Sequence, residues 1–170
     1  KQKDAPPSAR EGMSRKPQQG RSRASLERML AAARDSMIER GSEEFTLQEV
    51  SQRGNVSIGS IYLRFERKDN LVRAVIADSD VEIGDAEDAM FAMLRSECAS
   101  LAAFVPRYVE AYAEVLRQFA PLLRLSMERA SFDPLISAPG KARAQAAADA
   151  AATAILAYAD EIGGPDPQIK

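Results

Sequence analysis

With 170 residues, 45% of them hydrophobic, the chain is long enough to bury a core in one or two compact domains. The absence of histidine and the presence of one cysteine, Cys98, exclude most nucleophilic triads, histidine-based metal centres and an internal disulfide. The formal net charge of −2 hides a basic front, with 15 Lys and Arg against 12 Asp and Glu in residues 1–80, and an acidic back, with 8 against 13 in residues 81–170.

Residues 1–23 are predicted to form a disordered basic tail. They are rich in Pro, Gly, Ser and Gln and have almost no aliphatic side chain, so they cannot bury enough apolar surface to offset the entropy lost on ordering. Lys16, Arg21 and Arg23 come immediately before the first predicted helix. Two interpretations stay open: a solubilising tail, or an arm that follows phosphates or enters a minor groove of DNA.

The first helix is predicted from near Ser25 to Arg40, where Gly41 stops it. Its apolar residues fall at helical spacing on one face: Leu26, Met29, Leu30, Ala33 and Met37. We expect this face, together with Phe45, to form a small core with the two shorter helices that follow.

A short helix is predicted to begin after Thr46. The Thr46 hydroxyl can accept a hydrogen bond from the N–H three residues later, and Glu49 can reach back to the Thr46 N–H, which makes a capping box. Gly54 and Asn55 are expected to end this helix, because both residues tolerate left-handed backbone angles.

A second short helix is predicted over Ile58–Arg64, with Ser57 as its N-cap. Ile61 and Phe65 lie four residues apart and would anchor one face of this helix to the core. Two helices joined by so tight a turn cross steeply, which is the helix-turn-helix geometry of DNA-reading proteins. The simpler alternative is a structural helical hairpin, in which Tyr62 packs and Arg64 is solvated.

Side chains around the second short helix are suited to duplex DNA. Hydroxyls and cations hold phosphates, which is the role expected of Thr46, Tyr62 and Lys68, and small residues let the duplex backbone come close. Apolar Ile58, at the start of the helix, can pack on the C5-methyl of thymine but cannot read guanine or adenine. The full set of predicted DNA contacts is Thr46, Ser57, Ile58, Gly59, Ser60, Tyr62, Leu63, Arg64 and Lys68.

Two of these contacts have open alternatives. Leu63 would either add a second apolar contact to DNA or turn back to the core. Arg64, the long donor of this helix, would bond guanine or hold a phosphate.

The second half of the chain is predicted to be helical throughout, which makes the fold all-α. A long helix should begin at Lys68, end or bend at Gly84, and continue in pattern to a break near residues 95–100. Pro106 should start or kink the next helix, and Pro121 should stand in the first turn of another. We expect a loop over residues 132–140 and a final alanine-rich helix over residues 141–162.

The run from about Leu26 to Val75 resembles the N-terminal domain of the tetracycline-repressor (TetR-like) family of bacterial transcriptional regulators. The matching features are Glu39-Arg40-Gly41 after an amphipathic helix, Thr46, Val56-Ser57, Gly59-Ser60-Ile61-Tyr62, Phe65, Lys68 and Leu71. The sequence departs from the family at Gly54-Asn55, where Ala-Gly is usual and where Asn55 would take the left-handed position. It departs also at Ile58, where a polar residue is common, and at Arg67, where a small helix cap is usual.

The resemblance implies three segments: a tail (1–23), a three-helix DNA-binding domain (24–67), and an antiparallel helical bundle for ligand binding and dimerisation (68–170). It also implies a cytoplasmic repressor, homodimeric on a palindromic operator of double-stranded DNA and released by a small-molecule effector. The chain ends before the helices that usually build the family's dimer interface, so either those helices are missing or dimerisation uses earlier ones.

The bundle contributes aromatic and soft side chains for which two roles stay open. Ordinary core packing is the commoner role of such residues. The resemblance favours a pocket lined by some of them, and Tyr108 and Tyr112, one turn apart, could present both hydroxyls to it. The candidate pocket residues are Phe91, Phe104, Tyr108, Tyr112, Phe119 and Met127.

Other function classes are less well supported by the residues. Without histidine, the di-iron type of helical bundle cannot form, and we expect no enzyme activity, no metal and no cofactor. Carboxylate chemistry by Glu110 and Glu114 remains as an alternative, although residues so spaced usually form a solvated face. No apolar run is long enough for a membrane helix. The runner-up function is a protein-interaction module whose helix-turn-helix is only structural.

Overall fold

The computed structural model describes residues 15–162, and all regular structure in that range is helical. The prediction of an all-α fold is confirmed. No helix in this range is long and apolar enough to cross a membrane. The elements are α1 (Arg15–Arg40), α2 (Leu47–Arg53), α3 (Ile58–Arg64), α4 (Lys68–Glu97), α5 (Leu101–Ala130), α6 (Pro134–Leu156) and the short 3-10 helix η1 (Ala159–Glu161).

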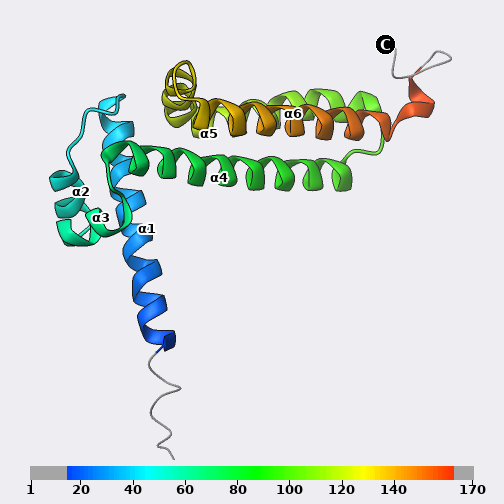
Figure 1. Cartoon of the computed structure of the whole chain (residues 1–170). Coiled ribbons are helices and arrows are strands. Elements are labelled where there is room, and N and C mark those ends of the chain that lie inside the picture. The colour runs from blue at the N-terminus through cyan, green and yellow to red at the C-terminus, as the bar shows by residue number, and fades with distance from the viewer. Residues whose placement is uncertain (1–14, 163–170) are drawn as a thin grey trace, which may run out of the picture.

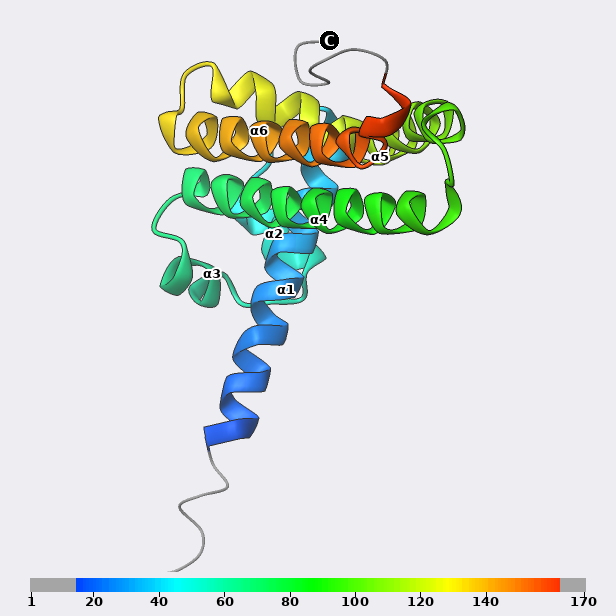
Figure 2. The ribbon, with the colours of Figure 1, turned by 90° about the vertical axis from the view of Figure 1, so that its right-hand side faces the viewer.

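The helices form two groups, which we call the head (α1–α3) and the bundle (α4–α6). In Figure 1, α1 stands upright at one end of α4, with α2 and α3 beside it, while α4, α5 and α6 run lengthwise. Figure 2 shows the same arrangement from the side, with the first turns of α1 extending beyond α2 and α3. Each bundle helix packs against the other two, and the chain reverses direction between them. The predicted order, a three-helix head followed by an antiparallel bundle, is confirmed.

Two clusters of buried apolar residues hold the chain together. The first contains head residues such as Met29 and Ile61, but also Val72 of α4, Leu122 of α5 and Ile136 of α6. The second lies farther along the bundle and is made by α4, α5 and α6. The head therefore shares its core with the end of the bundle that lies beside it, which we call the near end. A shift of the bundle helices at this end would change the packing of the head.

α1 begins at Arg15, about ten residues before the predicted start near Ser25, so the prediction of disorder is wrong for residues 15–23. Two contacts hold this early part of the helix. Arg64 of α3 donates to the carbonyl of Ser22 at 2.7 Å and also to its hydroxyl, and Arg23 pairs with Glu27 one turn later. The first of these is a tertiary contact, which composition cannot reveal. Residues 1–14 lie outside the described range.

The helix breaks that were predicted from prolines in the bundle are wrong. Pro121 lies inside α5 and Pro139 inside α6, which begins at Pro134, so the predicted loop over residues 132–140 is mostly helix. Pro106, Pro121 and Pro139 are all exposed. The carbonyl that each proline leaves unpaired four residues earlier can therefore bond water.

α4 does not end at Gly84: it passes through this residue and ends at Glu97, within the break predicted near residues 95–100. The last long helix ends at Leu156, six residues before the predicted Ile162, and η1 follows it.

A cluster of charged side chains joins the head to the bundle, and the buried Arg129 of α5 is its centre. This side chain is 5% exposed and donates to Asp133 (2.9 Å), Glu43 (2.6 Å) and Asp69 (3.1 Å). Asp133 accepts a further bond from Arg73 at 2.8 Å and is itself buried. Glu43 belongs to the connection between α1 and α2, so a single guanidinium ties that connection to α4, α5 and the start of α6.

The hydrogen bonds shift the pKa values within this Arg129 cluster. Burial alone would lower the pKa of Arg129, but its bonds to the three carboxylates outweigh burial and keep the pKa above its usual value. The bond from Arg73, and then that from Arg129, holds the pKa of Asp133 below its usual value. Arg129 and Asp133 therefore both stay charged near neutral pH.

Arg129→Met should lower the free energy of unfolding by about 3 kcal/mol, because it leaves a buried carboxylate with less compensation. Arg117→Met is the matched control, since Arg117 pairs with Glu114 on an exposed face and such pairs contribute ~0–1 kcal/mol. Urea denaturation followed by circular dichroism measures both. Equal losses in the two variants would contradict the role given to the cluster.

The stability that Asp133 contributes should depend on pH in a defined direction. Because its folded-state pKa lies below the ordinary value of 3.8, this contribution is present above about pH 4 and is lost as the pH falls further. Asp133→Asn keeps an N-cap for α6 but removes the charge. We therefore expect the variant to be less stable than the original protein at pH 7 and the difference in urea midpoint to shrink towards pH 2. A difference that stays constant over this range would rule out the charge as its cause.

Candidate nucleic-acid interface

The start of α2 is fixed by the predicted capping box. The Glu49 N–H donates to the Thr46 hydroxyl at 3.2 Å, and the Thr46 N–H donates to the Glu49 carboxylate at 2.7 Å. Arg40, at the end of α1, also pairs with Glu49. The hydrogen bond from Arg40, followed by that from the Thr46 N–H, lowers the pKa of Glu49 to about 2. The cap therefore stays charged and α2 stays attached to the end of α1.

The turn between α2 and α3 uses its two special residues differently. Asn55 takes the left-handed conformation, with φ of 47°, as predicted. Gly54 has φ of −80° and does not need that freedom, which corrects the reason given for it from the sequence. A Cβ at Gly54 would lie 2.9 Å from the carbonyl oxygen of Arg28 in α1, so glycine is required by close packing of helix on helix. Ser51 closes the turn by donating to the Val56 carbonyl at 2.6 Å.

The inner face of α3 is anchored as predicted. Ser57 caps the helix by accepting from the Ser60 N–H at 3.1 Å. Ile61 is fully buried, and Phe65, one turn later, is buried as well. Ile58 is partly buried and packs against the same core. These residues determine which side of the helix is left for a partner.

The outer face of α3 presents side chains that no core residue covers. Leu63 is 88% exposed and Tyr62 is 58% exposed. Gly59 is exposed one turn before Leu63, and no atom lies within 4 Å of the position a Cβ would take there. The question of whether Leu63 turns inward is thus decided: Leu63 faces solvent, and Ile58 is the residue that leans on the core.

Lys68, predicted to hold a phosphate, is held by the protein itself. Its ammonium donates to the carbonyl of Glu43 at 2.8 Å and to that of Phe45 at 3.3 Å, and it lies 5.2 Å from the centre of the Phe45 ring. Arg124 of α5 donates to the carbonyl of Gly41 in the same connection. Residues 41–46, which lead into α2, are therefore held by cations from α4 and α5, a role that nothing in the local sequence indicates.

Most of the predicted DNA contacts are exposed at the surface of the head. Thr46 is exposed at the start of α2, although its hydroxyl is already bonded to Glu49. The exposed members of α3 and its cap are Ser57, Gly59, Tyr62, Leu63 and Arg64, while Ser60 is half-buried. Arg64 is exposed but reaches across to Ser22, so it joins the first part of α1 to α3. Ile58 and Lys68 are the two members with mainly internal contacts.

The residues predicted to line a pocket mostly pack on one another. Tyr108 stacks with Phe91, Phe104 and Tyr112 at centroid distances of 5.7, 5.8 and 5.7 Å, and Phe119 is buried in the same cluster. Burial raises the pKa of both tyrosines. These five residues belong to the buried cluster at the end of the bundle away from the head, where their rings pack against one another. Met127 alone among the six lines a groove, which lies between α5 and α6.

Comparison with known proteins identifies the head. Residues 29–75 match the family model described as bacterial regulatory proteins, tetR family. No curated protein and no solved structure matches the chain. The matched segment covers the C-terminal part of α1, the whole of α2 and α3, and the first turns of α4, and it includes the exposed face of α3. The chain is therefore a DNA-binding transcription regulator whose N-terminal region is that of the tetR family of bacterial regulatory proteins.

Proposed function

We propose that the protein is a sequence-specific repressor that reads a palindromic operator with α3 and is released from it by a small-molecule effector bound in the bundle. The observation that carries the proposal is the outer face of α3, where an 88% exposed leucine follows a bare glycine on a helix whose other face is fully anchored. A single exposed leucine is ordinary on a protein surface, but Leu63 lies on the open face of the second helix of a helix-turn-helix, where such proteins contact DNA.

Gly59 supports a partner of a particular kind. Glycine inside a helix costs about 1 kcal/mol relative to alanine, and the open space around Gly59 means that packing within the protein does not require it. A duplex backbone that comes close to the start of α3 does require a small residue. The neighbouring hydroxyl of Tyr62 and the N-terminal end of α3 are groups that hold phosphates.

We assign the proposed contact with a base to Leu63 instead of Ile58. We keep the prediction that an apolar side chain of α3 contacts the C5-methyl of thymine in the major groove, because an aliphatic residue has no donor or acceptor. Leu63 is the side chain with the freedom to do so, while the partly buried Ile58 supports the helix beneath it. Arg64 is bonded to Ser22, and we propose that it holds the extension of α1, with Arg21 and Arg23, beside the phosphates.

The bundle supplies the remaining parts of the proposed function. An operator with two half-sites needs two copies of the chain, and α5 offers a face for pairing. Val105, Val109 and Leu116 lie at helical spacing on α5 and are all exposed. The effector would act through the shared core and the Arg129 cluster, since both connect the bundle to the head.

Leu63→Ala should weaken binding to a duplex selected from a random pool by about 1–2 kcal/mol while leaving the melting temperature unchanged, because the side chain is exposed. Replacing each thymine of the half-site by uracil in turn removes one methyl at a time. If Leu63 touches one of them, the two changes should be non-additive by at least about 0.5 kcal/mol at that position and additive elsewhere. Val81→Ala, at another exposed apolar residue on α4, is the control and should change neither property.

The outcome that contradicts this assignment is also defined. If Ile58→Ala couples to a thymine methyl and Leu63→Ala does not, then Ile58 reads the base despite its contact with the core. If neither couples, α3 does not read thymine through an apolar contact.

Gly59→Ala should stabilise the fold by up to about 1 kcal/mol and yet weaken DNA binding, because the added methyl group occupies space that the duplex needs. Gly84→Ala is the control, since Gly84 lies in the interior of α4 with open space around it, whereas Gly59 is the second residue of α3. It should give at least as large a gain in stability with unchanged DNA binding. Fluorescence anisotropy and thermal melting measure the two effects. Unchanged DNA affinity of Gly59→Ala would place the duplex away from the start of α3.

A further inference from the structure

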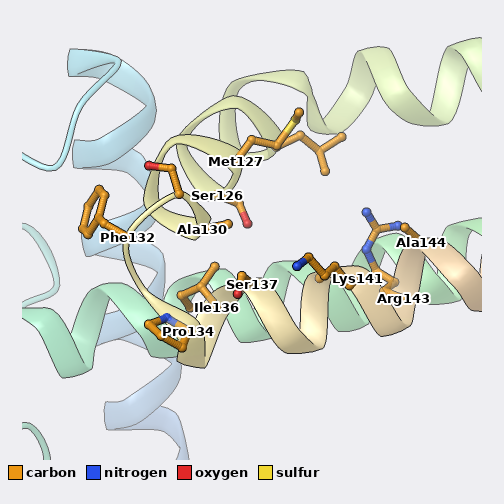
Figure 3. A pocket seen from close by; sticks show the side chains of 13 residues that line it. Ser126, Met127, Ala130, Phe132, Pro134, Ile136, Ser137, Lys141, Arg143 and Ala144 are labelled. Carbon is orange, nitrogen blue, oxygen red and sulfur yellow. The ribbon is translucent and has the colours of Figure 1, made fainter.

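The near end of the bundle contains a groove between α5 and α6, with a volume of about 780 Å³. Its walls are the last turns of α5, the first turns of α6 and the short turn that joins them (Figure 3). Met127 and Phe132 line it although they are 73% and 70% exposed. Ile136 forms a buried part of the wall. The groove is therefore large enough for a small organic molecule and mostly apolar.

One end of the groove is polar and contains two cations, Arg143, which is paired with carboxylates, and Lys141. Arg143 is balanced by carboxylates of α4: it donates to Glu87 at 3.2 Å, and its Nε lies 3.4 Å from a carboxylate oxygen of Asp80. Neither of these carboxylates lines the groove. Lys141 takes part in none of the ion pairs found within residues 15–162, and Figure 3 shows its ammonium next to Ser137, on the groove side of α6. Lys141 is thus the cation that the groove offers to a ligand.

We propose that this groove is the effector site, and that it takes an organic anion with an apolar body and one carboxylate or similar group. The apolar body would lie against Met127, Phe132 and Ile136, and the anionic group would pair with Lys141 and accept from the Ser137 hydroxyl. The word effector rests on the function proposed above, whereas the binding site itself does not.

The position of the groove gives its occupant a route to the head. Phe132 lies on the turn between α5 and α6, and the guanidinium of Arg129 is 5.5 Å from the centre of its ring. Arg129 in turn holds Glu43 in the connection that leads into α2. A ligand that packs on Phe132 therefore contacts the residue beside the Arg129 cluster, and DNA binding and ligand binding should oppose each other by the same factor.

The test uses the full chain and two probes of similar shape, 1-naphthoate and the neutral 1-naphthalenemethanol, titrated by calorimetry. Naphthoate should bind about 5-fold more tightly than the alcohol, which is the scale of one exposed ion pair. Lys141→Gln should abolish that preference. Arg95→Gln, which removes an exposed positive charge at the far end of α4, is the control and should preserve it.

A second variant tests whether the probes bind in the groove, independently of the charge of Lys141. Gly140 lines the groove, and no atom lies within 4 Å of the position of a Cβ there, so Gly140→Phe should fill the groove without disturbing the fold. It should abolish binding of both probes. Gly84→Phe makes the same change at a helical glycine outside the groove and should leave binding intact. Melting curves establish that all variants are folded.

Four results would overturn the site or its ligand class. These are equal affinity for the two probes, naphthoate binding that survives Gly140→Phe, no saturable binding of either probe, and a dimer that dissociates in Gly140→Phe while the original protein binds no probe. The last result would assign the groove to a second copy of the chain.

The effector role is tested separately with the selected duplex. Naphthoate should weaken duplex binding, and the duplex should weaken naphthoate binding equally, by a factor in the range of ~5–150. If naphthoate binds in the groove and the duplex affinity does not change, the site stands and the proposed release mechanism fails.

Discussion

Arg129 is almost fully buried and bonds three carboxylates. The position of the head relative to the bundle depends on these hydrogen bonds. The partners of Arg129 come from the connection before α2, from the first turn of α4 and from the N-cap of α6. A buried guanidinium is stable only when its donors are used, so each of these segments must stay in place for the others to remain satisfied. Removing one partner leaves a buried charge, which makes the arrangement specific as well as stable.

The same region is where apolar packing crosses from head to bundle. Leu122, Leu125 and Ile136 belong to the core that also buries Met29 of α1 and Ile61 of α3. The Arg129 cluster and the apolar core therefore connect the head to the same end of the bundle. Ile136 of this core also lines the α5–α6 groove, so the proposed ligand site lies beside the contact between the bundle and the head.

The exposed face of α3 follows from what the opposite face must do. Ile61 and Phe65 are buried, and Ile58 leans on the core beside them, which leaves Leu63 and Tyr62 outward on a short helix with little freedom to turn. The packing of Gly54 against Arg28 brings α2 close to α1 and fixes the angle of the turn. A rigid helix that presents an apolar side chain is suited to reading a groove, because binding does not require it to be ordered first.

Local chemistry made much of this structure predictable from the sequence. The capping box of Thr46 and Glu49, the Ser57 cap, the left-handed Asn55 and the anchoring pair Ile61 and Phe65 each depend on residues a few positions apart, so their spacing alone specifies them. The all-α fold, the order of head and bundle, and the helix-turn-helix follow from such signals added along the chain.

Tertiary contacts decided the rest. Whether Leu63 or Ile58 faces the partner depends on where the core lies, and Lys68 bonds carbonyls more than twenty residues away. Proline inside a helix removes one hydrogen bond and crowds the carbonyl four residues earlier, and α5 and α6 accommodate their prolines at positions exposed to water. The aromatic residues of the bundle stack instead of lining a cavity because rings on three elements meet there. Spacing along one chain determines what a helix can present, but only the packing of other helices determines which of its faces is left open.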